Sequence, residues 1–105
     1  MQVFFKEKYL SNLYKTGKDE KKHRYPPQII KKFIKTVDLM IAVPNTQSLM
    51  QFNALHYEKL VGDKAGLSSV RVNDQYRIEF EESRIGDETL ASIVNITDLS
   101  NHYTR

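Results

Sequence analysis

The 105-residue sequence contains no cysteine, no low-complexity run and no long apolar segment. The absence of cysteine excludes a disulfide scaffold, a thiolate metal site and a cysteine nucleophile. The first twelve residues, MQVFFKEKYLSN, lack the apolar stretch of a signal peptide, and no later segment approaches the length of a membrane span. We therefore expect a cytoplasmic protein that does not associate with membranes.

The composition is that of an ordinary globular protein, since 40% of the residues are apolar and 28% are charged. A chain of this length forms one domain, here residues 1–105. It can bury roughly two-thirds of its unfolded surface without help from disulfides or metals.

The charge is distributed unevenly along the chain. Residues 1–50 carry ten Lys and Arg against four Asp and Glu, whereas residues 51–105 carry six against nine. A basic half can bind a polyanion such as RNA or DNA, because neutralised phosphates release their counterions. The alternative is that the lysines lie on solvated faces with no partner. They are Lys15, Lys18, Lys21, Lys22, Lys31, Lys32 and Lys35.

Two helices are predicted in the basic half. Apolar residues at helical spacing predict the first over residues 6–16, which Gly17 would end. Pro26 and Pro27 suit the first turn of the second helix, and Pro44 would end it. The predicted apolar stripe of this second helix comprises Ile30, Phe33, Ile34, Val37 and Ile41.

Residues 68–80, SSVRVNDQYRIEF, predict a β-hairpin with a defined register. A two-residue turn would pair Arg71 with Tyr76 and mix polar with apolar side chains. A three-residue loop over residues 73–75 instead pairs Val70 with Ile78 and Arg71 with Arg77. Because cross-strand partners share one face, the apolar pattern selects the three-residue loop.

This register places two guanidinium groups side by side. Opposed like charges destabilise a strand pair by a few tenths of a kcal/mol, roughly. Arginine also binds phosphate through a bidentate fork, so Arg71 and Arg77 could form a phosphate clamp on a solvated sheet face. The alternative is that Glu79, Glu81 or an acid from another strand neutralises them. The pattern by itself favours neutralisation.

Further strands are predicted at both ends of the chain. Residues 90–97, LASIVNIT, are apolar on both alternating faces, as in a central strand covered on both sides. Residues 2–5 form a short strand or a strand-like lead-in, and residues 48–52 a helical turn. The tail beyond the central strand either presents Asn101, His102 and Tyr103 at a functional site or frays.

The segments LHYEKLVGDKAGLSSVRVNDQYRIEF and SIVNITDLSNHY together resemble the HigB, or plasmid-maintenance killer, branch of the RelE/ParE toxin superfamily. The family signature is a Leu-His pair, a Lys-Gly-Asp turn, a Ser-Ile-Arg-Val-Asn strand, a Trp-Arg-Ile segment and a terminal Tyr-His. The matching residues here are Leu55-His56, Gly62-Asp63, residues 69–73, Tyr76-Arg77-Ile78 and His102. The resemblance spans nearly the whole chain.

The resemblance implies a toxin of a type II toxin–antitoxin pair with an α+β fold. An N-terminal helical hairpin would pack on a small twisted antiparallel sheet, whose exposed concave face is the active site. Such toxins cleave messenger RNA in the decoding site of the ribosome without a metal or other cofactor. They are silenced by a small antitoxin, here expected to be a helix-turn-helix protein of the HigA type, in a complex that can be heterotetrameric.

The resemblance also implies roles for individual residues. Arg77 matches the family arginine at the cleaved phosphate, with Arg71 as its cross-strand neighbour. His102 matches the histidine that transfers a proton, and Tyr103 would stack on a base or relay a proton. The expected RNA contacts are Lys59, Lys64 and Asn101, one of the two lysines serving as a second catalytic cation. His56, by contrast, is expected to pack or cap near its loop.

Three departures from the signature leave the general base undefined. The family lysine before Gly-Asp is Val61 here, the aromatic residue before the serine is Ser68, and the ending is Asn-His-Tyr. Two other functions stay open: a ParE-like inhibitor of DNA gyrase that performs no chemistry, and a basic module that docks on ribosomal RNA through its helical hairpin. His102 and the arginine pair favour the ribonuclease.

Overall fold

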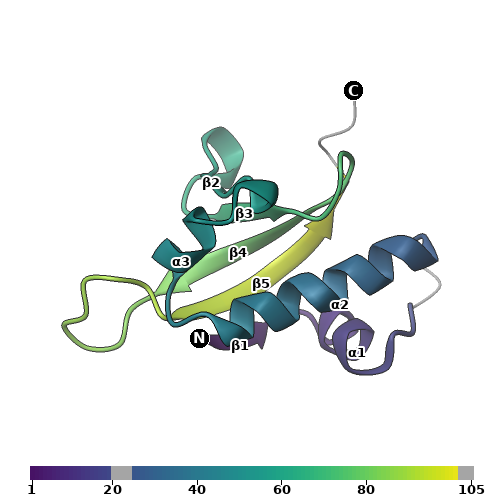
Figure 1. Ribbon diagram of the computed structural model, residues 1–105, viewed down its shortest axis with the longest axis horizontal. Helices are drawn as coiled ribbons and strands as arrows, with labels where there is room; N and C mark the ends of the chain where they lie inside the picture. Colours follow the sequence, from purple (N-terminus) through teal and green to yellow (C-terminus); the bar gives the residue numbers. More distant parts are fainter. Residues whose placement is uncertain (20–24, 102–105) are drawn as a thin grey trace.

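The computed structural model describes residues 1–19 and 25–101, which form one twisted sheet with helices packed on it (Figure 1). The strands are β1 (Gln2–Phe5), β2 (Glu58–Lys59), β3 (Ser68–Arg71), β4 (Arg77–Ser83) and β5 (Ile93–Ser100). Their order across the sheet is β1-β5-β4-β3-β2. No helix within the described ranges is long and apolar enough to cross a membrane.

The sheet is mixed, whereas an antiparallel sheet was expected. β2 to β5 are antiparallel neighbours, but β1 pairs in parallel with β5, so that Val3 lies beside Val94 and Phe5 beside Ile96. The alternation of side chains in a short strand is the same in either direction, and its partner lies about ninety residues away. The local sequence pattern therefore does not predict whether β1 pairs in parallel or antiparallel.

The helices are α1 (Lys8–Thr16), α2 (Pro27–Ala42) and α3 (Thr46–Met50), with 3₁₀ turns η1 (Asn53–Leu55) and η2 (Gly62–Lys64). α1 ends as predicted at Gly17, whose φ of 71° is left-handed and whose N–H reaches the carbonyl of Leu13. α2 begins at the predicted prolines. The side chain of Asn45 caps α3 by accepting from the N–H of Ser48 at 3.1 Å.

One face of the sheet forms the core beneath α1 and α2. Val70, Ile78, Phe80, Val94 and Ile96 are fully buried there. The helices cover them with Leu10, Leu13, Ile29, Phe33, Val37 and Met40. In Figure 1, α2 runs alongside the sheet, and α3 follows it at the left of the view.

The predicted apolar stripe of α2 was partly wrong. Phe33 and Val37 are buried as expected, and Ile30 and Ile34 pack against the core as partly buried residues. Ile29 and Met40 complete the buried face, while Ile41 is 44% exposed. The two stripes share Phe33 and Val37 and are rotated relative to each other by less than the roughly 100° between successive residues of a helix. Both are apolar, so the sheet that packs against α2 decides which one is buried.

The β3–β4 hairpin has the predicted register. Val70 pairs with Ile78 and Arg71 with Arg77. The loop over residues 73–75 is held by the side chain of Asn73, which accepts from the backbone N–H groups of Gln75 at 2.9 Å and Tyr76 at 2.8 Å. β5 is an interior strand between β1 and β4 that begins at Ile93 and continues to Ser100, whereas the middle strand of the sheet is β4.

Candidate functional site

The face of the sheet opposite the core carries a cluster of polar side chains around Arg77, which we name the polar face. It consists of Ser69 and Arg71 of β3, Arg77 and Glu79 of β4, and Asp98 and Ser100 of β5. The expectation of a solvated face was wrong at its centre. Ser69, Arg77, Glu79 and Ser100 are buried, and Arg77 exposes only 8% of its surface.

Arg77 is fixed by several partners. Its Nε donates to the Ser69 hydroxyl at 2.8 Å, and its Nη2 donates to the backbone carbonyl of His56. The Glu58 carboxylate of β2 lies 3.5 Å from the same nitrogen. An acid from another strand thus compensates this arginine, as the neutralisation alternative supposed. The contacts hold the planar guanidinium in one orientation, which suits a group that must be positioned in advance.

Arg71 is the more accessible member of the pair. It forms an ion pair with Asp74 in the hairpin loop, and the Asp74 side chain is 93% exposed. The hydrogen bond from Arg71 lowers the pKa of the Asp74 carboxyl below its ordinary value. Exposed pairs of this kind contribute little to stability, so an incoming phosphate could displace Asp74 at small cost.

Two acids face each other next to the arginine pair. Glu79 of β4 is in register with Asp98 of β5, and the ammonium of Lys64 lies 2.6 Å from the Glu79 carboxylate. Burial, followed by the nearby charge of Glu79, raises the pKa of Asp98 above its ordinary value. The Tyr9 hydroxyl donates to Asp98 at 3.4 Å. The polar face therefore combines three cations with several carboxylates.

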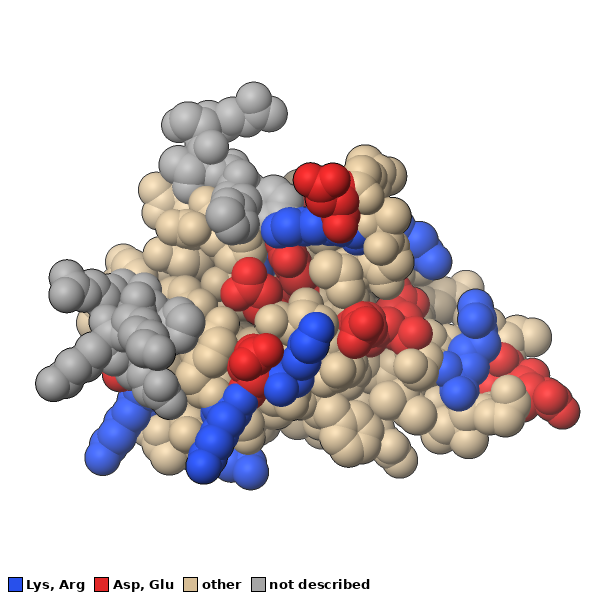
Figure 2. Space-filling view, turned by 180° about the vertical axis from the view of Figure 1, so that it is seen from behind, with Lys and Arg blue, Asp and Glu red and all other residues tan. Residues whose placement is uncertain are grey.

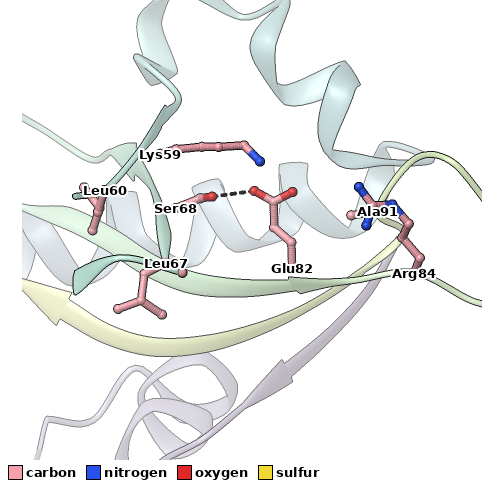
Figure 3. Close-up of a pocket in the computed structure, with 8 residues that line it drawn as sticks. Lys59, Leu60, Leu67, Ser68, Glu82, Arg84 and Ala91 are labelled. Carbon is pink, nitrogen blue, oxygen red and sulfur yellow. Dashed lines mark hydrogen bonds between the residues drawn. The ribbon is translucent and has the colours of Figure 1, made fainter. Parts of the chain in front are cut away.

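The structure separates the two candidate lysines. Lys64 reaches the polar face from η2. Lys59 is in register with Ser68, which is itself in register with the core residue Phe80, so Lys59 belongs to the core side of the sheet. Lys59 borders a cavity of about 330 Å³ between β3, β4 and Ala91. Figure 3 shows its side chain extending towards Ser68 and Glu82. Glu82 there accepts hydrogen bonds from Ser68 and from Tyr57.

His56 contributes to the site in a way that the sequence pattern did not indicate. It has the only positive φ among the described non-glycine residues, at 44°. This left-handed conformation turns its carbonyl towards Arg77, while the residue as a whole is exposed. Left-handed backbone is unfavourable for a side chain other than glycine and recurs at functional sites. The Leu-His pair of the family signature, Leu55-His56 here, was the one sequence feature that could have pointed to this position.

Strand β5 ends beside Arg77 of β4. Ser100, the last residue of β5, is in register with Arg77, and Asn101 follows it on the surface. Asn101 is therefore close in sequence to the polar face, as expected. His102 and Tyr103 lie outside the described residues, so their predicted roles stay predictions.

The described lysines of the basic half lie apart from the polar face. Lys31, Lys32 and Lys35 are exposed on α2 and form no ion pair with any described residue, while Lys21 and Lys22 lie outside the described ranges. The charge of Lys32 nevertheless contributes to the lowered pKa of Asp74. Figure 2 shows Lys and Arg interspersed with Asp and Glu, with no continuous basic surface on that side.

Comparison with known proteins agrees with this architecture. A family model described as a RelE-like toxin of type II toxin-antitoxin system HigB matches residues 3–96. The chain belongs to this family. It is also 32% identical over 82 residues to Toxin HigB-1 of Vibrio cholerae, covering 77% of this chain and 83% of that protein. The expected family is thereby confirmed, and this protein is a type II toxin of the HigB/RelE group.

Solved structures with low sequence identity share the HigB-like fold. A YoeB/ParE toxin from Agrobacterium tumefaciens is 18% identical and superposes with a TM-score of 0.55, covering 98% of this chain and all of that one. A chain of the YoeB-YefM complex from Staphylococcus aureus is 15% identical, with a TM-score of 0.53 and 98% coverage of both chains. The α+β fold class is thus confirmed.

Proposed function

We propose that this HigB-like toxin is a ribosome-dependent endoribonuclease that cleaves messenger RNA and so inhibits translation. Toxins of the HigB/RelE group are typically ribonucleases. The observation that carries the proposal is the group of cations on the polar face: Arg77, Arg71 and Lys64 lie on one side of the sheet, where β5 ends. Such a group can bind a phosphodiester and stabilise the charge that develops on it.

The proposed reaction uses the RNA's own 2′-hydroxyl as nucleophile. The 2′-oxygen attacks the adjacent phosphorus while the bond to the 5′-oxygen breaks, which leaves a 2′,3′-cyclic phosphate and a free 5′-hydroxyl. Arg77, held by Ser69 and the His56 carbonyl, faces the non-bridging oxygens. Arg71 exchanges Asp74 for phosphate when RNA binds. Lys64 supplies the second catalytic cation.

Proton transfer requires a base for the 2′-hydroxyl and an acid for the 5′-oxygen. We assign one role to His102, which follows β5 closely, and give Tyr103 a stacking or relay role. His56 is the second candidate, because its backbone contacts Arg77 and the residue is exposed. Asn101 binds the RNA beside Arg77, and Lys59, on the other face, binds only remote backbone phosphates.

A ParE-like inhibitor of DNA gyrase is the second candidate function. The observation that favours it is the deep burial of Arg77 and its pairing with Glu58. An arginine so placed could serve the fold alone, and a protein that inhibits gyrase by binding needs no phosphate site. The two functions differ in their target, so one pair of assays separates them.

The proposed partner is a small antitoxin. The Staphylococcus aureus relative was solved as a heterotetrameric YoeB-YefM complex. By analogy we propose a heterotetramer of this toxin with a helix-turn-helix antitoxin of the HigA type. It would disable the site by covering the polar face or by holding residues 101–103 away from it. A complex that leaves both free would instead act by excluding the toxin from the ribosome.

The test is primer extension on messenger RNA after brief induction of the toxin in cells. We expect new 5′ ends within translated regions, and purified toxin should produce the same cuts only when ribosomes are present. A supercoiling assay with purified gyrase serves as the counter-test. Inhibition of gyrase without any new RNA ends would replace the ribonuclease proposal with the second candidate.

A further inference from the structure

Glu79 is a buried carboxylate in the middle of the polar face. Its side chain is only 3% exposed, and it lies two residues from Arg77 on the same strand and the same face. Burial penalises a carboxylate strongly unless a cation and further hydrogen bonds compensate it. Lys64 supplies this cation at 2.6 Å, and the lysine side chain remains 36% exposed.

The surroundings of Glu79 are poorly suited to a purely stabilising acid. Asp98 stands directly opposite it in the β4–β5 register, and like charges opposed across strands are destabilising. Apolar replacements of buried ion pairs are often neutral or stabilising in proteins. The place of Glu79 beside Arg77 is therefore better explained by what it does to Lys64 than by stability.

Lys64 needs such an anchor because of where it starts. It belongs to a single 3₁₀ turn outside the sheet, between Gly62 with φ of 67° and Gly66 with φ of 97°. The turn follows β2, a strand of only two residues. Without a partner on β4, a long lysine side chain at this position would sample many rotamers in solvent.

No other lysine of this segment can take the place. Val61 stands where the family signature has its lysine and is 84% exposed, and Lys59 borders the cavity on the other face. We propose that Glu79 is a positioning residue that holds Lys64 on the polar face beside Arg77, so that this lysine replaces the cation missing at position 61. The inference rests on the proposed function, since it assigns Lys64 to the RNA phosphate.

The geometry allows Lys64 to contact both groups at once. An ammonium has three N–H donors, so Lys64 can donate to Glu79 and to an incoming phosphate together. The lysine side chain is partly exposed and the acid is buried, so the RNA would meet the ammonium and not the carboxylate. Glu79 thus acts through Lys64 and touches no substrate itself.

The test compares Glu79→Gln with the double variant Lys64→Met/Glu79→Gln. The double variant is the reference for a missing lysine, because Lys64→Met alone would remove a cation from a buried carboxylate that keeps its charge. Each variant is first checked for a cooperative thermal transition. Two quantities are then measured: the single-turnover cleavage rate on ribosomes, and the affinity for an RNA whose 2′-hydroxyls are methylated and cannot be cleaved.

We expect Glu79→Gln to lower both quantities by about tenfold to a hundredfold, the range for one charge-assisted hydrogen bond. The double variant should show nearly the same loss. Glu81→Gln is the matched control: it removes the same charge from an exposed position on the same strand. General electrostatics predicts that both single variants bind RNA slightly more tightly, so a loss confined to Glu79→Gln indicates positioning.

Two results would overturn the inference. In one, Glu79→Gln binds and cleaves at least as well as the parent while the double variant is impaired, so that Lys64 acts without its anchor. In the other, the double variant equals the parent, so that Lys64 contacts no phosphate. If the parent cleaves no RNA but the methylated RNA shows the expected losses, the ribonuclease proposal fails and the positioning of Lys64 stands.

Discussion

The two faces of the sheet are both buried around β4, yet they hold together by different interactions. The core face packs Ile78 and Phe80 in one hydrophobic cluster with residues of α1 and α2. Two residues on the polar face, Arg77 and Glu79, alternate with them along the same strand and are almost as inaccessible. One strand thus separates a hydrophobic layer from an ionic one.

This difference shows what burial means on each side. On the core face, burial is itself the stabilising term, because removing apolar surface from water is favourable. On the polar face, burial is a penalty that each charge offsets through a partner: Arg77 through Ser69, His56 and Glu58, and Glu79 through Lys64. We expect the first face to govern stability and the second to govern activity.

The largest expected effect is on the core face. Phe80→Ala removes a fully buried ring and should lower the free energy of unfolding by about 3–5 kcal/mol. Phe4→Ala, at a ring that is 53% exposed, is the matched control and should change it by less than about 0.5 kcal/mol. Urea unfolding measures both. Equal losses would mean that the sheet has no preferred core face.

On the polar face, a slightly smaller effect is expected, and it concerns the cleavage rate. Arg77→Lys keeps a cation but loses the fork that contacts Ser69 and the His56 carbonyl. The single-turnover cleavage rate should fall by about 10²–10³, as for removal of one group that stabilises transition-state charge. Arg84→Lys, near the end of the same strand, should cleave normally. An Arg77→Lys variant that is destabilised but fully active would assign Arg77 to the fold alone.

Arg71 should matter less than its neighbour, because its partner Asp74 lies in solvent. Arg71→Ala should slow cleavage about tenfold, the effect of one modest electrostatic contact. Asp74→Asn frees the guanidinium and should leave the rate equal or slightly raised. Equal losses from Arg71→Ala and Arg77→Lys would remove the distinction between a fixed and an exchangeable arginine.

The raised pKa of Asp98 predicts a pH dependence of stability. The folded state holds the Asp98 proton more tightly than the unfolded state, so this group's contribution is complete below the ordinary carboxyl pKa and is lost as pH rises through the folded value. Asp98→Asn should therefore raise the melting temperature at pH 7, with little effect near pH 3. Asp87→Asn, in an exposed loop, is the control. A parent–variant difference that is the same at both pH values would contradict the assignment.

The smallest effect is expected at the exposed lysines of α2. Lys31→Glu/Lys32→Glu on α2 should weaken sedimentation with ribosomes and reduce the log–log salt slope by about one for each lost phosphate contact. The positions of the cuts should stay the same, since these lysines touch neither Arg77 nor its partners. Arg84→Glu is the control for charge reversal. Binding curves that match the parent at two salt concentrations would leave these lysines without a ribosomal partner.

Much of the core face could be predicted from the sequence. Alternating apolar residues and the side-chain chemistry of Asn73 define the hairpin register, and glycine and proline define where α1 ends and α2 begins. These features depend on neighbours within a few residues. The resemblance to HigB toxins supplied the fold class and family, which periodicity alone does not give.

The polar face was predicted only in part. The alignment of Arg71 with Arg77 follows from the register, but the burial of Arg77 does not, because His56 and Glu58 come from a separate segment about twenty residues earlier. The choice between Lys59 and Lys64 was likewise undecided. It depends on which face of a two-residue edge strand points towards Arg77.

The sequence by itself thus determined the local elements, the register of the hairpin and the residue types at the site. Tertiary structure alone decided the parallel pairing of β1 with β5, the buried side of α2 and the partners of each charge. The physical reason is range. Backbone conformation and alternation are set by adjacent residues, whereas a charge buried in a sheet is compensated by whichever segments the fold brings within a few ångströms.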